Sequence, residues 1–287
     1  MAKIGWIGLG QMGTPMATHL LQDNSLMVYN RTSAKAKPLV EQGATLAQSV
    51  PELLTNSDVI FLMVTDFYAI ESIIDEDFLS HISDKTLINM STIAPAESRT
   101  VSTWITEHNG QYVEAPVSGS VFAAESGSLL ILTAGTESIV NGLEPLWQAL
   151  GTYKYSGSIG NGTALKLVLN ALLGMFGEAY SEAILLGEAF GLSKQAILDT
   201  ISESVIGTPF FEYKKTLFAS EKFDPQFMLK HITKDMNLIQ GFMQQSHLNL
   251  PVVHKDVTIY NKTSSNEDSN LDMTVVYQYL KDMKASE

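Results

Sequence analysis

The sequence IGWIGLGQMG at residues 4–13 decides the fold of this chain. An apolar run, Ile4–Ile7, leads directly into three glycines spaced as G-x-G-x-x-G, and a helical pattern follows them. Gly8 permits a tight turn, Gly10 lets a phosphate approach the backbone, and Gly13 lets a helix pack closely on a strand. The N-terminus of such a helix offers free N–H groups to phosphate oxygens. The stretch therefore predicts a strand, a turn and a helix that bind a dinucleotide.

The end of the next apolar run, Ser25–Tyr29, falls about 20 residues after the first glycine, where the ribose-reading residue is expected. Asn30, Arg31 and Thr32 stand there. An acidic residue would accept hydrogen bonds from the ribose hydroxyls, whereas a neutral amide, a guanidinium and a hydroxyl favour a 2′-phosphate. We therefore predict NADP(H) in preference to NAD(H). Two alternatives remain open: a turn that binds nothing, and an Arg31 that is a solvated surface charge.

Composition limits the class of protein. The chain has 287 residues, 45% of them hydrophobic, and a formal net charge of −13 with scattered basic residues, which argues against nucleic-acid and anionic membrane partners. The absence of cysteine excludes disulfides, thiolate zinc sites and a cysteine nucleophile, and no metal site is expected. No uncharged apolar run reaches the ~18 residues of a membrane span. Because the glycine stretch begins at residue 4, no targeting peptide is expected, and the predicted location is cytoplasmic.

Up to about residue 160, short apolar runs alternate with helical patterns, which predicts an α/β fold with a doubly wound, largely parallel sheet of Rossmann type. The further expected strands are Val59–Val64, Thr86–Met90, Gln111–Ala115 and Leu129–Thr133. Ligands of such sheets bind at the carboxyl ends of the strands. Polar or turn-forming residues follow three of these strands, at Thr65–Asp66, Ser91–Pro95 and Pro116–Ser120.

After residue 160 the strand signals largely stop. Residues 163 to about 190 contain no proline and predict one long helix. Its start, Thr163–Gly174, is apolar nearly all round and is expected to be buried at the domain junction. The remainder predicts further helices, with a polar loop at Asn261–Ser269. We expect residues 1–160 to form an NADP-binding Rossmann domain and residues 161–287 an all-helical domain for substrate binding and dimerisation, with the long helix joining them. A domain this small and apolar suggests at least a dimer.

Lys166 and Asn170 are the candidate catalytic pair. They stand four residues apart on the predicted long helix and so share one face of it. A buried ammonium is costly unless it has a partner or a task. The alternative is a lysine whose stem packs on the core while its ammonium reaches water. Two other segments add to the case: Ser118-Gly119-Ser120, which offers hydroxyl and N–H groups to a carboxylate, and the adjacent Lys234 and Asp235 on a later helix.

The chain resembles the β-hydroxyacid dehydrogenases, which include 3-hydroxyisobutyrate dehydrogenase, tartronate semialdehyde reductase and the glyoxylate/succinic semialdehyde reductases. Several ordered motifs carry the resemblance over essentially the whole length: Ile4–Gly13, Asn30-Arg31-Thr32, Ser91-Thr92, Glu114–Ser120, Gly160–Asn170 and Lys230–Met236. The resemblance implies an N-terminal Rossmann domain joined through a long helix to a helical domain that pairs with a second subunit, as a homodimer or homotetramer.

By that resemblance, Lys166 exchanges a proton with the substrate oxygen and Asn170 binds the substrate and orients the lysine. Ser118, Gly119 and Thr92 hold the substrate carboxylate, while Phe227 and Asp235 lie beside the substrate. Lys234 reaches the cofactor. The full set of expected cofactor contacts is Gly8, Leu9, Gly10, Gln11, Met12, Gly13, Asn30, Arg31, Thr32, Val64, Thr65, Thr92 and Lys234.

The match is nearest to the glyoxylate/succinic semialdehyde branch and implies an NADPH-dependent reductase of a small carboxylated aldehyde. Val121-Phe122-Ala123 departs from that branch, where this segment is more polar, and Glu125-Ser126 also differs, so the identity of the aldehyde stays open. Other hypotheses are a dehydrogenase that oxidises a β-hydroxyacid of the 3-hydroxyisobutyrate type, a catalytically silent NADP-binding interaction module, and an imine-reducing enzyme. The presence of Lys166 disfavours the last two.

Overall fold

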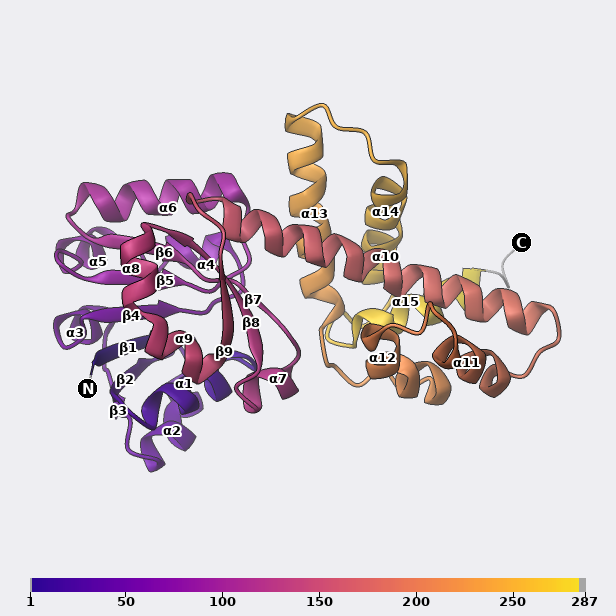
Figure 1. The fold of residues 1–287 in the computed structure, drawn as a ribbon, viewed down its shortest axis with the longest axis horizontal. Coiled ribbons are helices and arrows are strands. Elements are labelled where there is room, and N and C mark those ends of the chain that lie inside the picture. Colours follow the sequence, from indigo (N-terminus) through magenta and orange to yellow (C-terminus); the bar gives the residue numbers. More distant parts are fainter. Residues whose placement is uncertain (1, 284–287) are drawn as a thin grey trace. The chain divides into compact units, whose positions relative to one another are not determined.

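The computed structural model describes residues 2–283. The chain divides into two compact units, Met1–Lys166 and Leu167–Glu287. In Figure 1 the first unit runs from indigo to magenta-red and the second from red to yellow.

Unit 1 is built on a nine-stranded sheet with the order β3-β2-β1-β4-β5-β6-β8-β7, and β9 pairs with β8 (Figure 1). Strands β1 to β6 are parallel, whereas β8 is antiparallel to both β6 and β7. The strands are β1 (Lys3–Ile7), β2 (Ser25–Tyr29), β3 (Thr45–Leu46), β4 (Val59–Leu62), β5 (Thr86–Asn89), β6 (Gln111–Glu114), β7 (Val117–Ser118), β8 (Leu129–Gly135) and β9 (Gly151–Tyr155). The expected strands are all present.

Helices cover both faces of this sheet, because successive side chains of a strand point to opposite sides. Trp6 of β1 belongs to one apolar cluster, with Met16 and Trp147, while the next residue, Ile7, belongs to another, with Phe78 and Val101. The helices are α1 (Gly13–Leu21), η1 (Ser33–Ala36), α2 (Lys37–Glu41), α3 (Val50–Thr55), α4 (Phe67–Glu71), α5 (Glu76–Ser80), α6 (Pro95–Glu107), α7 (Val121–Glu125), α8 (Glu137–Gly142) and α9 (Glu144–Leu150). This arrangement confirms the predicted doubly wound α/β fold.

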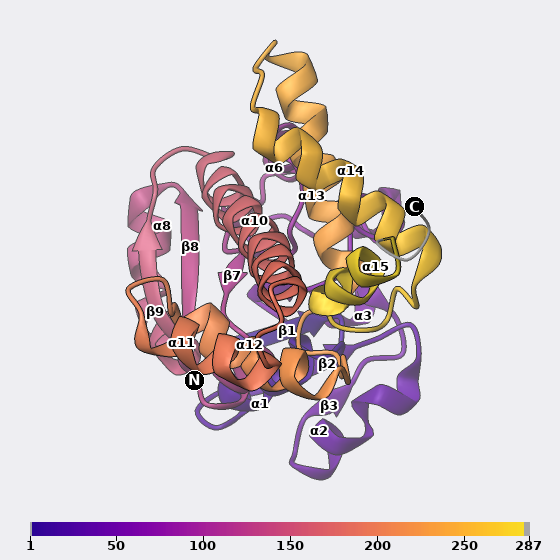
Figure 2. The same ribbon diagram turned by 90° about the vertical axis from the view of Figure 1, so that its right-hand side faces the viewer.

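Unit 2 is helical (Figure 2). The long helix α10 (Asn161–Ala189) begins in unit 1 and continues through unit 2, where an aromatic-rich core includes Tyr180, Phe211 and Tyr260. The other elements are α11 (Lys194–Glu203), α12 (Pro209–Ser220), α13 (Leu229–Gln245), α14 (Pro251–Asn266), η2 (Met273–Val275) and α15 (Val276–Met283). Within residues 2–283, no helix combines the length and apolar character that a membrane crossing requires. The cytoplasmic location stays a prediction.

The prediction of a loop at Asn261–Ser269 is wrong for most of that segment, because α14 continues to Asn266. Its polar sequence hides one buried face, to which Tyr260 and Thr263 belong. The polar residues satisfy one another in the helix: the side-chain amides of Asn261 and Asn237 pair across α14 and α13 at 2.8–3.0 Å. Polarity alone therefore gave the wrong prediction for a helix that buries only a narrow stripe.

The prediction that the start of α10 is buried is wrong for one side of the helix, where Val168 and Leu172 are exposed, and this exposed apolar side continues along the helix. We call this side the α10 stripe. Leu186 is 57% exposed and Val168 58%. The members of the stripe recur every three or four residues, the spacing of one helix face: Leu165, Val168, Leu172, Phe176, Ala179, Ala183, Leu186 and Phe190.

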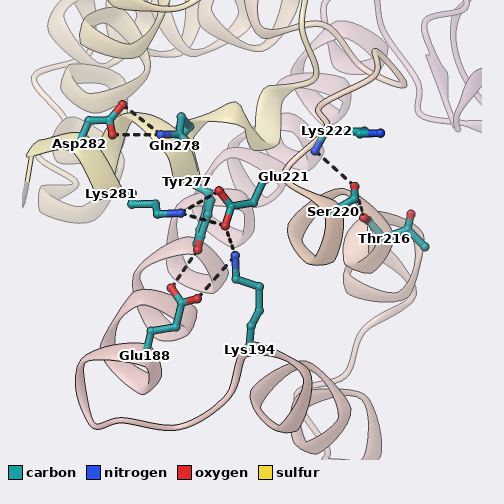
Figure 3. A network of polar contacts seen from close by, with 10 residues as sticks. All are labelled: Glu188, Lys194, Thr216, Ser220, Glu221, Lys222, Tyr277, Gln278, Lys281 and Asp282. Atoms are coloured by element: carbon teal, nitrogen blue, oxygen red, sulfur yellow. Dashed lines mark hydrogen bonds and ion pairs between the residues drawn. The ribbon is translucent and has the colours of Figure 1, made fainter.

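Four helix ends of unit 2 meet in a polar network (Figure 3). Lys194, at the start of α11, pairs with Glu188 of α10 and with Glu221, which ends α12 in a left-handed conformation with φ 52°. Lys281 of α15 reaches both Glu221 oxygens at 2.8–2.9 Å, and the Tyr277 hydroxyl donates to Glu188 at 2.9 Å. The network fixes the ends of four helices to one another.

A buried carboxylate, Asp272, organises the segment between α12 and η2. It is fully buried and accepts hydrogen bonds from Lys214 Nζ at 2.6 Å, from the backbone N–H groups of Gln226 and Phe227 at 2.9–3.0 Å, and from Thr274. Burial lowers the pKa of Lys214, and the charge of Asp272 opposes that effect. The carboxylate thus compensates a buried ammonium and fixes the backbone that leads into α13.

We predict that Asp272→Asn lowers the free energy of unfolding by about 3–5 kcal/mol, because it leaves the Lys214 ammonium buried without its counter-charge. Urea denaturation followed by circular dichroism measures the loss. Asp199→Asn is the matched control, since Asp199 pairs with Lys215 at the surface, where such pairs contribute at most about 1 kcal/mol. Equal losses in the two variants would contradict the structural role of Asp272.

Candidate active site

The glycine turn between β1 and α1 leaves space where a pyrophosphate is expected. Gly8 has φ +103°, and a Cβ there would lie 2.1 Å from the Met63 carbonyl oxygen. A Cβ at Gly13 would lie 2.1 Å from the Gly8 carbonyl oxygen, whereas one at Gly10 would meet no atom within 4 Å. Two glycines are therefore required by the turn itself, and the third leaves the backbone open on the outer side. Leu9, Gln11 and Met12 complete the turn, which fits a dinucleotide phosphate.

Asn30 braces this turn. Its Oδ1 accepts a hydrogen bond from the Leu9 backbone N–H at 2.9 Å, and its Nδ2 donates to the Thr32 carbonyl oxygen at 2.9 Å. The side chains of Arg31 and Thr32 are exposed at the end of β2. The structure thus assigns the Asn30 amide to shaping the loop, and it leaves Arg31 and Thr32 accessible to a ligand.

The carboxyl ends of β4 and β5 are tied together by Ser91. Its Oγ accepts a hydrogen bond from the Val64 N–H at 3.0 Å, and its own N–H donates to Asn89 Oδ1 at 3.0 Å. Ser91 is fully buried, whereas the neighbouring Thr65 is exposed and Thr92 is half-buried. The three predicted residues Val64, Thr65 and Thr92 therefore lie at the carboxyl ends of β4 and β5. Ser91 holds these two strand ends together.

The segment with Ser118 and Gly119 is a short strand followed by a turn. In β7, Ser118 pairs with Leu130 of β8. Gly119 has φ +147°, and a Cβ there would lie 2.8 Å from the Leu129 side chain. Ser120 Oγ then accepts a hydrogen bond from the Ala123 N–H at 3.3 Å and caps α7. Ser118 is half-buried and Gly119 exposed, so the loop presents both at the surface of unit 1.

Glu114 anchors the helix that carries Lys166. It stands at the end of β6, is fully buried, and accepts hydrogen bonds from the Gly160 N–H at 2.7 Å, the Gly162 N–H at 2.9 Å and the Thr163 hydroxyl at 3.2 Å. A carboxylate at a helix N-terminus is stabilised by the free N–H groups and by the helix dipole. The first turn of α10 is thereby fixed to the sheet, and Lys166 follows it directly with 8% of its surface exposed.

In unit 2, Asn170, Asp235 and Lys234 form one polar cluster. Asn170 Nδ2 donates to Asp235 Oδ2 at 2.6 Å, and Lys234 Nζ lies 2.7 Å from Asp235 Oδ1. Asn170 is fully buried and Asp235 is 2% exposed. Because the amide nitrogen is engaged, Asn170 is left with its carbonyl oxygen, which has no hydrogen-bond donor in the described part of the chain. That oxygen is an acceptor on the turn of α10 that follows Lys166.

Phe227 lies just before α13. Its ring stacks on the His231 imidazole with centroids 6.3 Å apart and planes inclined by 20°. Its backbone is held at both ends, because the Phe227 N–H donates to Asp272 and its carbonyl oxygen accepts from the Met273 N–H at 2.8 Å. Asp272 thus sets the position of a predicted substrate residue.

Glu114, Ser91 and Asp272 are not among the site residues predicted from the sequence. Glu114 has a signal that sequence reasoning can use: an acidic residue at the end of an apolar strand, in a chain whose next long helix opens with glycines. Asp272 has none, since its partners Lys214, Gln226 and Phe227 lie 45 to 58 residues away along the chain.

Comparison with known proteins identifies both units. Residues 3–160 match the family model of the NAD binding domain of 6-phosphogluconate dehydrogenase. Residues 160–280 match the model described as NAD-binding of NADP-dependent 3-hydroxyisobutyrate dehydrogenase. Together the two models cover nearly the whole chain and support binding of a nicotinamide cofactor.

Several proteins with similar sequences or structures are also dehydrogenases or reductases. The chain is 33% identical to glyoxylate/succinic semialdehyde reductase 2, chloroplastic, of Arabidopsis thaliana, over 99% of this chain and 81% of that protein. It is 32% identical to reductase 1 of the same plant, over 97% and 98%. The structure of Mycobacterium tuberculosis 3-hydroxyisobutyrate dehydrogenase with L-serine matches with a TM-score of 0.88 and 25% identity, over 98% of this chain and 99% of that one. The chain therefore belongs to the β-hydroxyacid dehydrogenase family, whose members are NAD(P)-dependent oxidoreductases related to 3-hydroxyisobutyrate dehydrogenase.

Proposed function

We propose that this protein is an NADPH-dependent reductase of small carboxylated aldehydes of the glyoxylate or succinic semialdehyde type, with Lys166 as the proton donor. The observation that carries the proposal is a lysine ammonium on a buried side chain, placed one helical turn beyond the capped start of α10 and one turn before the buried Asn170. Similarity to two glyoxylate/succinic semialdehyde reductases over almost the entire chain supports the substrate class.

The bound nicotinamide supplies the hydride, and the protein supplies position, a proton and charge compensation. In this proposal Lys166 donates its proton to the carbonyl oxygen as negative charge develops there. Ser118, Gly119 and Thr92 bind the substrate carboxylate through hydroxyl and N–H groups, and Phe227 contacts the carbon chain. The reverse reaction, in which Lys166 removes the hydroxyl proton of a β-hydroxyacid, is the second candidate, and the resemblance to a 3-hydroxyisobutyrate dehydrogenase structure supports it.

Asp235 acts in this scheme as the group that orients Asn170. By accepting from Nδ2 at 2.6 Å it leaves the buried Asn170 carbonyl oxygen, which has no donor within residues 2–283, to accept a hydrogen bond from the Lys166 ammonium or from a substrate hydroxyl. Lys234, paired with Asp235, contributes a positive charge near the cofactor in the proposal. The orientation of Asn170 is thus a consequence of the Asp235 carboxylate.

Preference for NADP(H) over NAD(H) is proposed from the end of β2. Arg31 and Thr32 are exposed there, and the Asn30 amide that replaces an acidic residue is engaged with the turn. A guanidinium beside a hydroxyl binds a 2′-phosphate well, and no carboxylate at these three positions repels it.

We further propose that residues 161–287 form a substrate and dimerisation domain and that the α10 stripe binds a second copy of the chain. Contiguous exposed apolar surface of this kind marks interaction sites in soluble proteins. A stripe that runs the length of a 29-residue helix can pack on its own symmetry mate. The proposed assembly is a homodimer or a homotetramer built from dimers.

Lys166→Ala is expected to lower kcat for glyoxylate and succinic semialdehyde by about 100- to 10,000-fold, the usual contribution of a positioned acid. Binding of NADPH, followed by its fluorescence, should be unchanged. Lys262→Ala, an exposed lysine of α14, is the control and should leave kcat unaltered. Retained turnover in Lys166→Ala would remove the lysine from this role, and a wild-type protein that binds NADPH but reduces no aldehyde would indicate a catalytically silent module.

Arg31→Ala is expected to raise KM for NADPH by roughly 10- to 150-fold, because a charge-assisted hydrogen bond is worth about 1.5–3 kcal/mol. KM for NADH should stay the same, since NADH has no 2′-phosphate. Lys37→Ala, which removes an exposed lysine paired with Glu41, serves as the control. Equal changes for NADPH and NADH would refute a role of Arg31 in phosphate recognition.

The double variant Leu172→Asp, Leu186→Asp is expected to be monomeric in sedimentation velocity at concentrations where the wild type is at least dimeric, because it places two charges in the stripe. Val40→Asp in unit 1 is the matched control, since Val40 is 41% exposed and Leu172 42%. A monomeric wild type, or a double variant that still assembles, would rule out the stripe as an interface.

A further inference from the structure

Four residues follow one another at four-residue spacing along α10: Lys166, Asn170, Gly174 and Glu178. Residues four apart are neighbours on successive turns of a helix, so Gly174 follows Asn170 and Glu178 follows Gly174 along the surface of α10. Helix α14 packs directly on that face. The Tyr260 hydroxyl donates to the Gly174 carbonyl oxygen at 3.2 Å, and a Cβ at Gly174 would lie 2.7 Å from Asp256 Oδ2. The packing of α14 on α10 therefore depends on the environment and the protonation state of the Asp256 carboxyl group.

Asp256 is fully buried, and neither of its carboxyl oxygens accepts a hydrogen bond from an N–H or hydroxyl group within residues 2–283. The titratable group that faces it from α10 is Glu178, which is half-buried. From α13 the neighbouring side chain at Gly174 is Met236, which carries no charge, and from α14 itself the titratable neighbour is Tyr260. An ionised carboxylate in such surroundings is strongly disfavoured.

We propose that Glu178 and Asp256 share one proton, and that this pair is a positioning device that holds α14 against the α10 face on which Asn170 lies. A proton between two carboxyl groups supplies the donor that Asp256 otherwise lacks and leaves a single negative charge on the pair. Loss of that proton puts two like charges at the contact, which favours movement of α14 away from Gly174.

Burial, together with the hydrogen bond and the charge of Glu178, raises the pKa of Asp256 to about 9 from its usual 3.8. The folded chain therefore binds a proton that the unfolded chain releases between these values. The resulting stabilisation is complete below about pH 4 and is lost progressively as the pH rises to about 9. Above that pH this group no longer changes the free energy of unfolding with pH, because Asp256 is then ionised in both the folded and the unfolded chain.

The first test does not depend on enzymatic activity. Infrared spectra of the full chain at pH 7 should contain the carbonyl band of a buried protonated carboxylic acid, and the band should disappear as the pH rises through about 9. Asp256→Asn should remove the band, and Glu182→Gln, which changes an exposed glutamate one turn further along α10, should leave it. A wild-type spectrum without the band at pH 7 would overturn the proposal.

The second test compares thermal unfolding of wild type, Asp256→Asn, Glu178→Gln and Glu182→Gln between pH 5 and pH 9. Tm of the wild type and of Glu182→Gln should fall by at least about 4 °C more than Tm of Asp256→Asn, since each 1 kcal/mol shifts Tm by about 2–4 °C in a chain of this size. Glu178→Gln, the other pair variant, should keep part of the fall, because burial still raises the pKa of Asp256 there. In each pair variant an amide donates to the remaining carboxylate and no proton is shared. Identical pH dependence in all four proteins would contradict a shared proton.

The positioning role rests on the proposed function and has its own readout. In the wild type, KM for the aldehyde should rise several-fold as the pH passes 9 while KM for NADPH stays constant, and Asp256→Asn should suppress that rise. If the infrared band is present but KM for the aldehyde depends on pH in the same way in the wild type and in Asp256→Asn, the shared proton stands and the positioning role is overturned. An inactive wild type that passes the infrared and thermal tests would instead refute the proposed function alone.

Discussion

The hydrogen bonds between the Glu114 carboxylate and the first turn of α10 are the constraint on which the rest of this protein depends. A fully buried negative charge is tolerated there because backbone N–H groups and a hydroxyl surround it and because the helix dipole is aligned with it. The contact fixes the start of a 29-residue helix to the edge of the sheet. Lys166 stands on the next turn, and the helices of unit 2 build their core around the continuation of the same helix.

Several polar residues near the candidate site bind other parts of the chain. Asn30 shapes the glycine turn, Ser91 joins two strand ends, and Asp235 orients Asn170. Asp272 fixes the backbone at Phe227. Such groups fix the positions of a small number of side chains that remain accessible to ligands. Preorganisation of this kind is what a hydride transfer requires, because reacting atoms must meet in a narrow range of geometries.

The sequence predicts those parts of the fold that local patterns encode. The strands of unit 1 follow from apolar runs with turn residues between them, and the glycine turn follows from its spacing and its context. Two predictions fail because they concern tertiary neighbours: α14 extends through a polar segment by burying a narrow face, and α10 exposes a stripe that no other helix of the described chain covers.

Long-range pairs are the part of the site that no pattern reveals. Glu114 and Gly160 are 46 residues apart, Asn170 and Asp235 are 65 apart, and nothing in either local sequence names the partner. The resemblance to known dehydrogenases supplies candidate residues such as Lys166 and Asn170, but it does not say which atom of an amide is left without a hydrogen-bond partner or which carboxylate keeps a proton. Those properties come from the packing of helices against one another.

The close approach of Gly174 to Asp256 has an evolutionary consequence. A methyl group at position 174 would lie 2.7 Å from Asp256 Oδ2 and 3.0 Å from Met236 Sδ, so an alanine there requires the side chain at position 256 to move or to be shorter. The two positions are therefore strongly non-additive: substitution surveys that change one residue at a time will score position 174 as intolerant, although a coordinated exchange is open to the lineage.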